Sequence, residues 1–437
     1  MLSSRGARAS APALSYWSDF SAALADLHDP ANNPAGAIPL CVAENGLSAP
    51  LVAARLTSRA APLRGVLGYD DMRGRASLRG AFAALAEARI TRGARVRAEA
   101  LCVSAGCGAL IAALATLLLE AGDGVLLPVP TYGALYNDFS VLAGAAVIDV
   151  PRGADAAGAP RAPDVAALEA AAVAAEARGV RPRMLFLINP CNPTGAVLGR
   201  GDVAAAMAWA RARGLHVVVD EVYALSVWGE GGEPFVSAAT IAADAAGGAG
   251  GDYLGGDVHI LWGFSKDFCA SGLRTGVLFT HNAALLAALS NVNYFATVSN
   301  DTQDALAALV ADATFVDGFL AANAAALRGA YALTTAALRR ARVPFAPATS
   351  GMFVWLSLRE LLPAAAAGEG AWARERALAA ALFAEEKLVL TPGEAMHAAE
   401  EGCFRLCFAW PASIDTLHEA LRRLEGFVAR RRAALAA

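Results

Sequence analysis

The segment Trp262-Gly263-Phe264-Ser265-Lys266-Asp267-Phe268 holds one of only two lysines in a chain of 437 residues. Lysine and arginine together occupy 36 positions, so arginine stands at almost every basic site. Arginine suffices wherever only a positive charge is needed, but a guanidinium cannot form a Schiff base with a carbonyl group. Lys266 is therefore a candidate for chemistry that requires a primary amine.

The other lysine is a control for this argument. Lys387 lies in Glu385-Glu386-Lys387-Leu388-Val389-Leu390, where a helix is expected to give way to a strand and a solvated charge is the simpler explanation. Lys266 instead follows Val258 to Trp262, an apolar run that predicts a buried strand. We therefore assign the amine chemistry to Lys266.

Apolar runs alternate with alanine-rich helical runs through the middle of the chain. The runs lie at Val125 to Leu127, Met184 to Ile188, His216 to Val219, Val258 to Trp262 and Gly276 to Phe279. This alternation predicts the α/β class with a mostly parallel sheet, and open sheets of this class bind ligands at the carboxyl ends of their strands. The glycine-rich stretch from Gly229 to Gly256 predicts a surface loop.

The length predicts about two or three domains, at roughly 150 residues per domain. After about Val310 the pattern changes to long helices and then to alternating strands at Met352 to Leu358 and Cys403 to Phe408, which predicts a second, smaller α+β domain. We expect residues 1–55 to form an N-terminal arm and part of the small domain, residues 56–310 the large domain, and residues 311–437 the C-terminal small domain.

Charge and hydropathy narrow the class of partner. The net charge is -4 and no basic stripe is present, so we expect a small-molecule partner and no nucleic acid. Leu101 to Leu119 carries no charge and is long enough to span a bilayer. Because Gly106 and Gly108 interrupt it, we interpret this stretch as a buried strand, a turn and a buried helix, and expect no membrane association.

Seven cysteines are scattered along the chain without a Cys-x-x-Cys pair. This pattern favours a reducing compartment, for which we take the cytoplasm, and argues against a structural metal. Residues 1–14 contain Arg5, Arg8 and no acid, as a transit peptide would, but they are short, and we interpret them as an N-terminal arm.

Three further motifs surround the lysine segment in sequence. They are Asn189-Pro190-Cys191-Asn192-Pro193-Thr194-Gly195, Asp220-Glu221-Val222-Tyr223 and Ser271-Gly272-Leu273-Arg274-Thr275-Gly276. In this order and at this spacing they resemble the class I/II aminotransferases of pyridoxal phosphate (PLP) fold type I. The resemblance runs from the first residues to about Trp410. It implies a large domain with a mostly parallel seven-stranded sheet between helices, plus a smaller α+β domain.

The resemblance also implies the cofactor, pyridoxal 5'-phosphate, and residues that hold its ring. Lys266 would carry the cofactor covalently and later remove the α-proton of the substrate. Asp220 would keep the pyridine nitrogen protonated, as the cofactor's role as an electron sink requires. Tyr223 and Asn192 would hydrogen-bond the phenolic oxygen, and Tyr132 would stack on the ring.

The phosphate group needs backbone donors and cations. Ala105-Gly106-Cys107-Gly108 precedes an apolar helix, whose N-terminus favours an anion, and Arg274 supplies charge. Gly263 stands where the family usually has a hydroxyl residue, which leaves Ser265 as the hydroxyl neighbouring Lys266. Tyr69 matches a tyrosine that reaches the phosphate from the neighbouring subunit, so the resemblance implies a homodimer with shared active sites.

The substrate residues come from both ends of the chain. Arg405 lies mid-strand among apolar residues in Phe404-Arg405-Leu406-Cys407-Phe408, and it would hold the substrate α-carboxylate together with Asn192. Leu2-Ser3-Ser4-Arg5-Gly6 and Leu40-Cys41-Val42-Ala43-Glu44-Asn45 resemble the 1-aminocyclopropane-1-carboxylate (ACC) synthase-like branch. In that branch Glu44 would lie near the far end of the substrate.

Three functional hypotheses follow. The first is amino transfer from an L-α-amino acid to a 2-oxo acid. The second is ACC synthase activity on S-adenosylmethionine, which Glu44 favours. The third is a regulator that binds PLP without turnover. The cofactor motifs do not separate the first two, because both reactions begin with the same proton removal.

Overall fold

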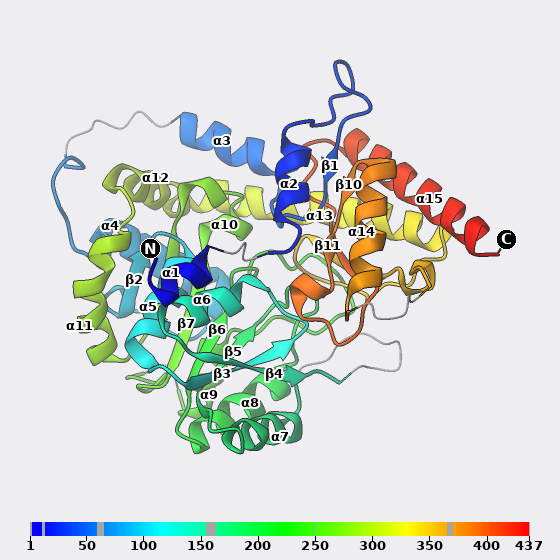
Figure 1. Ribbon diagram of the computed structural model, residues 1–437. Helices are drawn as coiled ribbons and strands as arrows, with labels where there is room; N and C mark the ends of the chain where they lie inside the picture. Colours follow the sequence, from blue (N-terminus) through cyan, green and yellow to red (C-terminus); the bar gives the residue numbers. More distant parts are fainter. Residues whose placement is uncertain are drawn as a thin grey trace.

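The structure is a computed structural model that describes residues 2–10, 14–58, 65–153, 163–248, 250–364 and 370–436. Its largest element is a seven-stranded sheet with the order β2-β8-β7-β6-β5-β3-β4 (Figure 1). The strands are β2 (Leu101–Ser104), β3 (Asp123–Val129), β4 (Ala146–Pro151), β5 (Arg181–Ile188), β6 (His216–Asp220), β7 (Val258–Gly263) and β8 (Gly276–Thr280). Of these seven, β8 alone runs antiparallel to its neighbours β2 and β7. The expected α/β fold with a mostly parallel seven-stranded sheet is confirmed.

Both faces of this sheet are covered by helices. In β6, Val217 and Val219 pack in one core and Val218 packs in the other, because successive side chains of a strand point to opposite faces. The first face is covered by α4 (Ala76–Leu85), α7 (Val165–Glu176), α8 (Arg200–Ala212), α9 (Ala238–Ala245) and α12 (Asn300–Ala311). The second is covered by α5 (Cys107–Leu118), α6 (Ala134–Leu142) and α11 (Ala283–Val292). Burial on both faces explains why the strands are unbroken apolar runs in the sequence.

The uncharged stretch from Leu101 to Leu119 forms β2 and α5, with Gly106 at the turn between them. All four residues of β2 are buried, and α5 buries one apolar side against the sheet. The interpretation as strand, turn and helix is therefore confirmed. Within the described residues no single helix is long and apolar enough to cross a membrane, although α12 and α13 (Ala313–Arg340), bent by 83° at their junction, pass together by length and composition.

A second group of elements packs around a core of its own. Its strands are the antiparallel set β9 (Phe353–Ser357), β12 (Cys403–Cys407) and β11 (Thr391–Pro392), and the parallel pair β1 (Ile38–Pro39) and β10 (Leu388–Val389). Its helices include α14 (Ala373–Glu386) and α15 (Ile414–Ala436). Ile38 and Leu40 near the N-terminus share this core with residues from Leu327 to Val428.

Helix α13 connects the two groups of elements. Val316 and Phe319, in its first turns, pack in the core under the large sheet, whereas Leu327 and Leu338 pack in the second core. The remaining helices are short: α1 (Ser4–Ala9), α2 (Trp17–Leu24), α3 (Ala49–Thr57) and α10 (Phe264–Asp267). Helix α1 packs against α6 (Figure 1).

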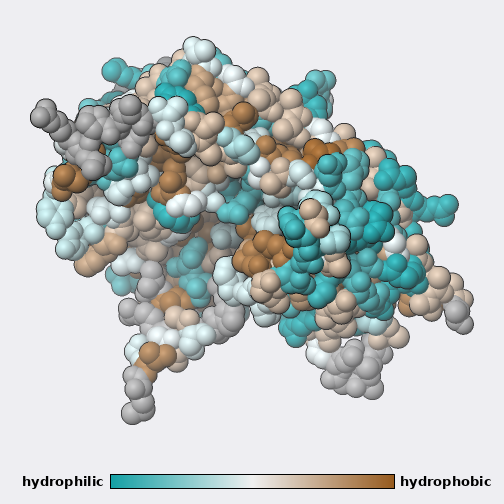
Figure 2. Space-filling model, turned by 90° about the horizontal axis from the view of Figure 1, so that it is seen from above, coloured by the Kyte–Doolittle hydropathy of each residue, from teal (hydrophilic) through white to brown (hydrophobic). Residues whose placement is uncertain are grey.

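Hydrophilic side chains gather on the right-hand part of the molecule, where α14 and α15 lie (Figure 2). Many of these charges are paired between the two helices or within α15. The pairs are Arg430 with Glu386, Arg431 with Glu385, and both Arg422 and Arg423 with Glu419. These pairs neutralise much of the positive charge of α15.

Candidate active site

A cavity of about 330 Å³ opens at the carboxyl ends of β5, β6 and β7. Most of the residues that the sequence assigned to cofactor or substrate meet here: Cys107, Gly108, Tyr132, Asn192, Asp220, Tyr223, Ser265, Lys266, Arg274 and Arg405. They come from segments almost 300 residues apart in the chain, between Cys107 and Arg405. The parallel sheet brings them together because parallel strands end at one edge.

Lys266 lies in α10, immediately after β7, and its side chain points into the cavity. Its Nζ donates a hydrogen bond to the Ala43 carbonyl at 2.6 Å. Burial, and then the positive charge of Arg405, lower the pKa of the Lys266 amine. A lowered pKa increases the fraction of neutral amine, the form that can act as a nucleophile or a base.

Lys387 lies in a different environment. Its side chain is exposed, 3.7 Å from the Asp26 carboxylate and over the Phe383 ring. It also ends α14 in the left-handed conformation, with a φ of 56°. These contacts make Lys387 a surface charge, in agreement with its use as the control.

The residue next to Lys266 anchors this turn. Asp267 is fully buried and accepts three hydrogen bonds, from Leu225 N at 2.9 Å, Trp262 Nε1 at 2.9 Å and Ser226 Oγ at 2.6 Å. Leu225 and Ser226 belong to the loop that follows Asp220 and Tyr223. Asp267 therefore ties the lysine turn to the loop that carries the other ring-binding residues. No motif in the sequence indicates this role.

Asp220 ends β6 with its carboxylate buried. Burial raises the pKa of Asp220 to about 6, while the Val222 N–H at 3.0 Å and the charge of Lys266 lower it. A cation opposite this carboxylate would remove much of the desolvation penalty. Tyr223 lies one turn further along, buried and edge-on to the Phe353 ring at 5.4 Å.

Arg405 is buried in β12 and reaches into the same cavity. Its Nη1 donates to Asn192 Oδ1 at 2.9 Å, and its Nη2 donates to Thr391 Oγ1 at 3.1 Å and to the Cys41 carbonyl. Among the described residues, none of the ion pairs includes Arg405, and its Nε has no hydrogen-bond partner. A buried guanidinium with a free donor and no acidic partner is suited to bind an incoming carboxylate.

A glycine-lined cradle lies at the N-terminus of α5. Gly106 has a φ of 86°, and a Cβ there would lie 2.6 Å from Arg274 Nη2. A Cβ on Gly276 would lie 2.5 Å from the Gly106 carbonyl carbon. Backbone donors at this helix end and the Arg274 guanidinium form a site for an anion such as phosphate.

Gly263 leaves little room for the hydroxyl side chain that the family usually has at this position. A Cβ on Gly263 would lie 3.0 Å from Cys107 Sγ and 3.2 Å from the Thr275 carbonyl oxygen. The Cys107 thiol fills this space and donates to the Trp262 carbonyl at 3.4 Å. Ser265 lines the cavity instead, on the turn of Lys266.

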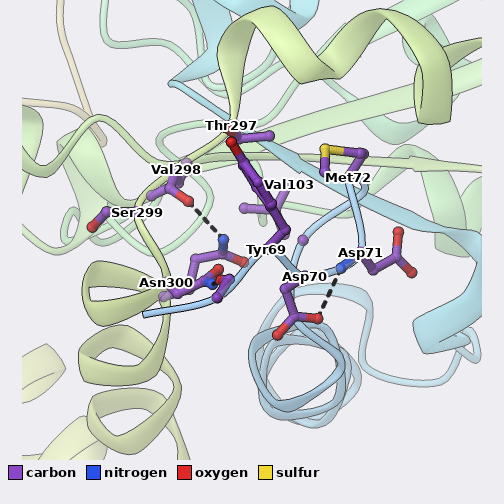
Figure 3. Close-up of a pocket in the computed structure, with 12 residues that line it drawn as sticks. Tyr69, Asp70, Asp71, Met72, Val103, Thr297, Val298, Ser299 and Asn300 are labelled. Carbon is purple, nitrogen blue, oxygen red and sulfur yellow. Dashed lines mark hydrogen bonds between the residues drawn. The ribbon is translucent and has the colours of Figure 1, made fainter. Parts of the chain in front are cut away.

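Glu44 and Tyr69 do not line this cavity. Glu44 accepts a hydrogen bond from Ser271 Oγ and lines a second cavity of about 480 Å³, whose wall shares Ser265 and Ser271 with the first. Tyr69 is 92% exposed and lies in a separate surface pocket beside Thr297 and Asn300 (Figure 3). Within a single chain, Tyr69 therefore lies outside the site.

Sequence reasoning missed the part of the cavity that the N-terminal segment contributes. Leu14, Tyr16 and Trp17 line it, as does Asp138 of α6. Tyr16 is buried, and burial raises its pKa to about 12. The adjacent aromatic residues Tyr16 and Trp17 do not by themselves predict a binding site, because their position in the fold depends on how the N-terminal arm packs.

The donor set fits pyridoxal phosphate. The cavity offers an enclosed amine, a buried carboxylate for the ring nitrogen, a glycine cradle with an arginine for the phosphate, and the Tyr132 ring, which is still 38% exposed. The Arg405 guanidinium, which lines the cavity and has no acidic partner among the described residues, suits the carboxylate of an amino acid. Fold and site together define a PLP-dependent enzyme.

Comparison with known proteins gives the family. A profile of the class I and II aminotransferases matches residues 32–424, and the chain belongs to this family. ACC synthase 3 of Oryza sativa subsp. japonica is 33% identical, with 94% of this chain and 92% of that protein covered. ACC synthase-like protein 1 of Bos taurus is 33% identical, with 91% of this chain and 77% of that protein covered.

Solved structures share the fold. Aspartate aminotransferase of Thermotoga maritima matches with a TM-score of 0.76, covering 98% of this chain and 100% of that chain, at 21% identity. The Thermus thermophilus aspartate aminotransferase with maleate matches with a TM-score of 0.77, covering 98% and 99%, at 20% identity. At this identity the likeness establishes the architecture alone.

Proposed function

We propose that the protein transfers the amino group of an L-α-amino acid to a 2-oxo acid. The observation that supports this most directly is that Arg405, which has no acidic partner among the described residues, lines the same cavity as Lys266. An arginine without an acidic partner would hold the carboxylate of an amino acid or an oxo acid in turn. The enzyme would thus bind both substrates of amino transfer at one place.

Each side chain has a part in this reaction. Arg405 and Asn192 would orient the substrate so that its Cα–H bond faces Lys266, whose amine would take the proton and return it. Asp220 would hold a proton on the ring nitrogen. Bound pyridoxal phosphate would supply the electron sink that makes the α-proton acidic. Tyr223 and Asn192 would hold the ring oxygen beside the lysine.

A second candidate is ACC synthase activity on S-adenosylmethionine. Two observations favour it: Glu44 bonds Ser271 at the wall shared by the two cavities, and the similar proteins from rice carry that name. A bulky substrate group would extend from the first cavity past this wall into the second. The two candidates differ in the fate of the substituent on Cγ, which leaves only in the second.

The purified holoenzyme separates these candidates in two parallel assays. One supplies a panel of L-amino acids with 2-oxoglutarate and measures glutamate and the new oxo acid. The other supplies S-adenosylmethionine and measures methylthioadenosine and ACC. We expect oxo acid in the first assay, whereas methylthioadenosine without oxo acid would replace our first candidate with the second. Cofactor binding without turnover in either assay would favour the non-catalytic regulator.

We further propose that the active unit is a homodimer in the cytoplasm. The exposed Tyr69 and the neighbouring pocket would face the second subunit, where Tyr69 would complete the phosphate site (Figure 3). All seven cysteines are free, as a reducing compartment would keep them. Size measurement by light scattering tests the dimer, and a monomer that retains full activity would contradict it.

A further inference from the structure

Asp138 is an acid without a partner in the active-site cavity. It lies in α6, partly buried, on the wall that also carries Tyr132. Within the described part of the chain, no hydrogen bond or ion pair engages its carboxylate. Burial raises the pKa of Asp138 to about 6, because it destabilises the charged carboxylate; a nearby cation would stabilise that charged form.

The three cationic side chains that line the cavity form hydrogen bonds to other groups in the described part of the chain. Lys266 is bonded to the Ala43 carbonyl, Arg274 to the Ser271 carbonyl, and Arg405 to Asn192, Thr391 and Cys41. Asp149 of β4 differs from Asp138, because its carboxylate accepts a hydrogen bond from the hydroxyl group of Tyr136 in α6. Asp138 therefore keeps its full hydrogen-bonding capacity for a ligand.

Aromatic rings share the cavity with Asp138. Tyr132 is 38% exposed and Trp17 is 51% exposed, while the buried Tyr16 lines the same space. The negative charge of Asp138 contributes, after burial, to raising the pKa of Tyr132, so the two side chains lie near each other. A carboxylate close to electron-rich rings is the environment that attracts sulfonium, ammonium and guanidinium groups.

We propose that Asp138, with Tyr16 and Trp17, forms a subsite for a positively charged group at the far end of the amino-acid substrate. This inference rests on the proposed function, because it assumes that an α-amino acid occupies the cavity with its carboxylate at Arg405. It narrows the substrate class to amino acids with a cationic side chain. Amino transfer, the first reaction proposed above, would use such a substrate.

Matched ligands that differ only in charge test the subsite. The holoenzyme is titrated with S-methyl-L-methionine, a sulfonium, and with L-methionine, its neutral thioether, while the visible absorbance of the bound cofactor is followed. L-Lysine and L-norleucine form a second pair. We expect the cation of each pair to bind about tenfold more tightly, because a partly buried ion pair and a cation–π contact together contribute on the order of 1 kcal/mol.

Three variants assign the preference to the carboxylate. Asp138→Asn should lose the tenfold preference while binding L-methionine as before. Asp138→Glu should retain a preference for the cation. Asp202→Asn removes the same charge from an exposed position in α8, and should leave both affinities unchanged. In steady-state assays the Asp138→Asn change should raise KM for cationic donors and leave kcat for neutral donors intact.

The outcomes are distinguishable. Equal affinity for both members of each pair in the native enzyme, or a preference that persists in Asp138→Asn, would overturn the subsite while leaving the proposed function standing. Failure of every amino acid to change the cofactor absorbance would instead refute the proposed function, and the subsite with it. Thermal unfolding of each holoenzyme variant checks that Asp138→Asn folds as the native protein does.

Discussion

Lys266 and its neighbour Asp267 have different roles in the site: Lys266 supplies an amine to the cavity, and Asp267 holds the turn in place through three hydrogen bonds. Lys266 could be identified because its argument is local: one amine, placed after a buried strand in a chain with two lysines. Asp267 could not, because its importance comes from Trp262, Leu225 and Ser226, which the fold brings to it from two segments. A reactive residue in a local motif can be predicted from the sequence, whereas a hydrogen-bond network between distant segments cannot.

The two lysines give a direct test at this scale. Purified protein carrying Lys266→Ala should lack the visible absorbance of covalently bound cofactor and should lose nearly all turnover. Lys387→Ala should keep both, because that side chain forms only surface contacts, a long ion pair with Asp26 and a contact with the Phe383 ring. Absorbance spectra of the two variants after incubation with pyridoxal phosphate make the comparison, and the reverse pattern would refute the assignment.

Asp267 gives a second test. In Asp267→Asn an amide N–H₂ replaces one acceptor oxygen, so at least one of the three donors loses its partner in a buried site. We expect the free energy of unfolding to fall by about 1–3 kcal/mol, the usual effect of one unsatisfied buried donor. Urea unfolding of the cofactor-free protein measures this.

The matched control for Asp267 is Asp244→Asn, which breaks an exposed ion pair with Arg200. That change should alter stability by less than about 0.5 kcal/mol, as surface substitutions usually do. Weakened cofactor binding in Asp267→Asn, without a change in Asp244→Asn, would show that the anchor also positions the lysine turn. Equal stability of the two variants would contradict the role given to Asp267.

At the scale of elements, the sequence predicted the strands that are buried on both faces. It did not predict β4 and α9, whose formation depends on contacts with other parts of the chain. Strand β4 escaped notice because it lies at the edge of the sheet, with a mixed pattern of buried and exposed residues. Helix α9 arose in the stretch from Gly229 to Gly256 that we expected to be a loop. Glu221 stabilises its start by accepting hydrogen bonds from Ser237 Oγ and Ala238 N, a contact that no local pattern shows.

The contact between β8 and α5 is open to a test of its own. Gly276→Ala would place a Cβ 2.5 Å from the Gly106 backbone, so the N-terminus of α5 must move. We expect the dissociation constant for pyridoxal phosphate to rise at least about tenfold, since backbone donors and the helix dipole act over short distances. Fluorescence titration of the cofactor-free protein measures this affinity.

Gly80→Ala is the matched control for Gly276→Ala. Gly80 lies in α4 with open space around the position of a Cβ, so alanine should stabilise the helix by up to about 1 kcal/mol. Cofactor affinity should not change. If Gly276→Ala binds the cofactor as tightly as Gly80→Ala does, the cradle is not sensitive to the position of α5.

At the scale of the whole molecule, the parts that sequence reasoning missed are those set by docking. Leu14, Tyr16 and Trp17 reach the cavity only because the N-terminal arm packs over it. Tyr69 lies outside the cavity of its own chain (Figure 3). The site residues at strand ends were predictable, because parallel strands end at the same edge of a sheet. Contacts between distant segments or subunits were not, because they depend on surfaces that form only in the folded protein.

A mixing experiment tests the proposal that two subunits share each active site. Tyr69→Phe and Lys266→Ala homodimers should each have low activity. After dissociation and reassociation together they should recover part of it, because a mixed dimer has one site with both Tyr69 and Lys266 intact. Activity is measured before and after mixing, with each variant mixed with itself as the control. No recovery would indicate that each chain completes its own site.

The contrast between an enclosed Lys266 and an exposed Lys387 has a consequence for mapping by proteolysis. A protease specific for lysine would cut the native protein first at Lys387, near the junction of α14 and β10, and would yield a C-terminal fragment that contains α15 and is detected after denaturation. Cleavage after Lys266 would require prior unfolding or an opened cavity. The rate of cleavage after Lys266, compared with the rate after Lys387, would therefore report how often the active site becomes accessible.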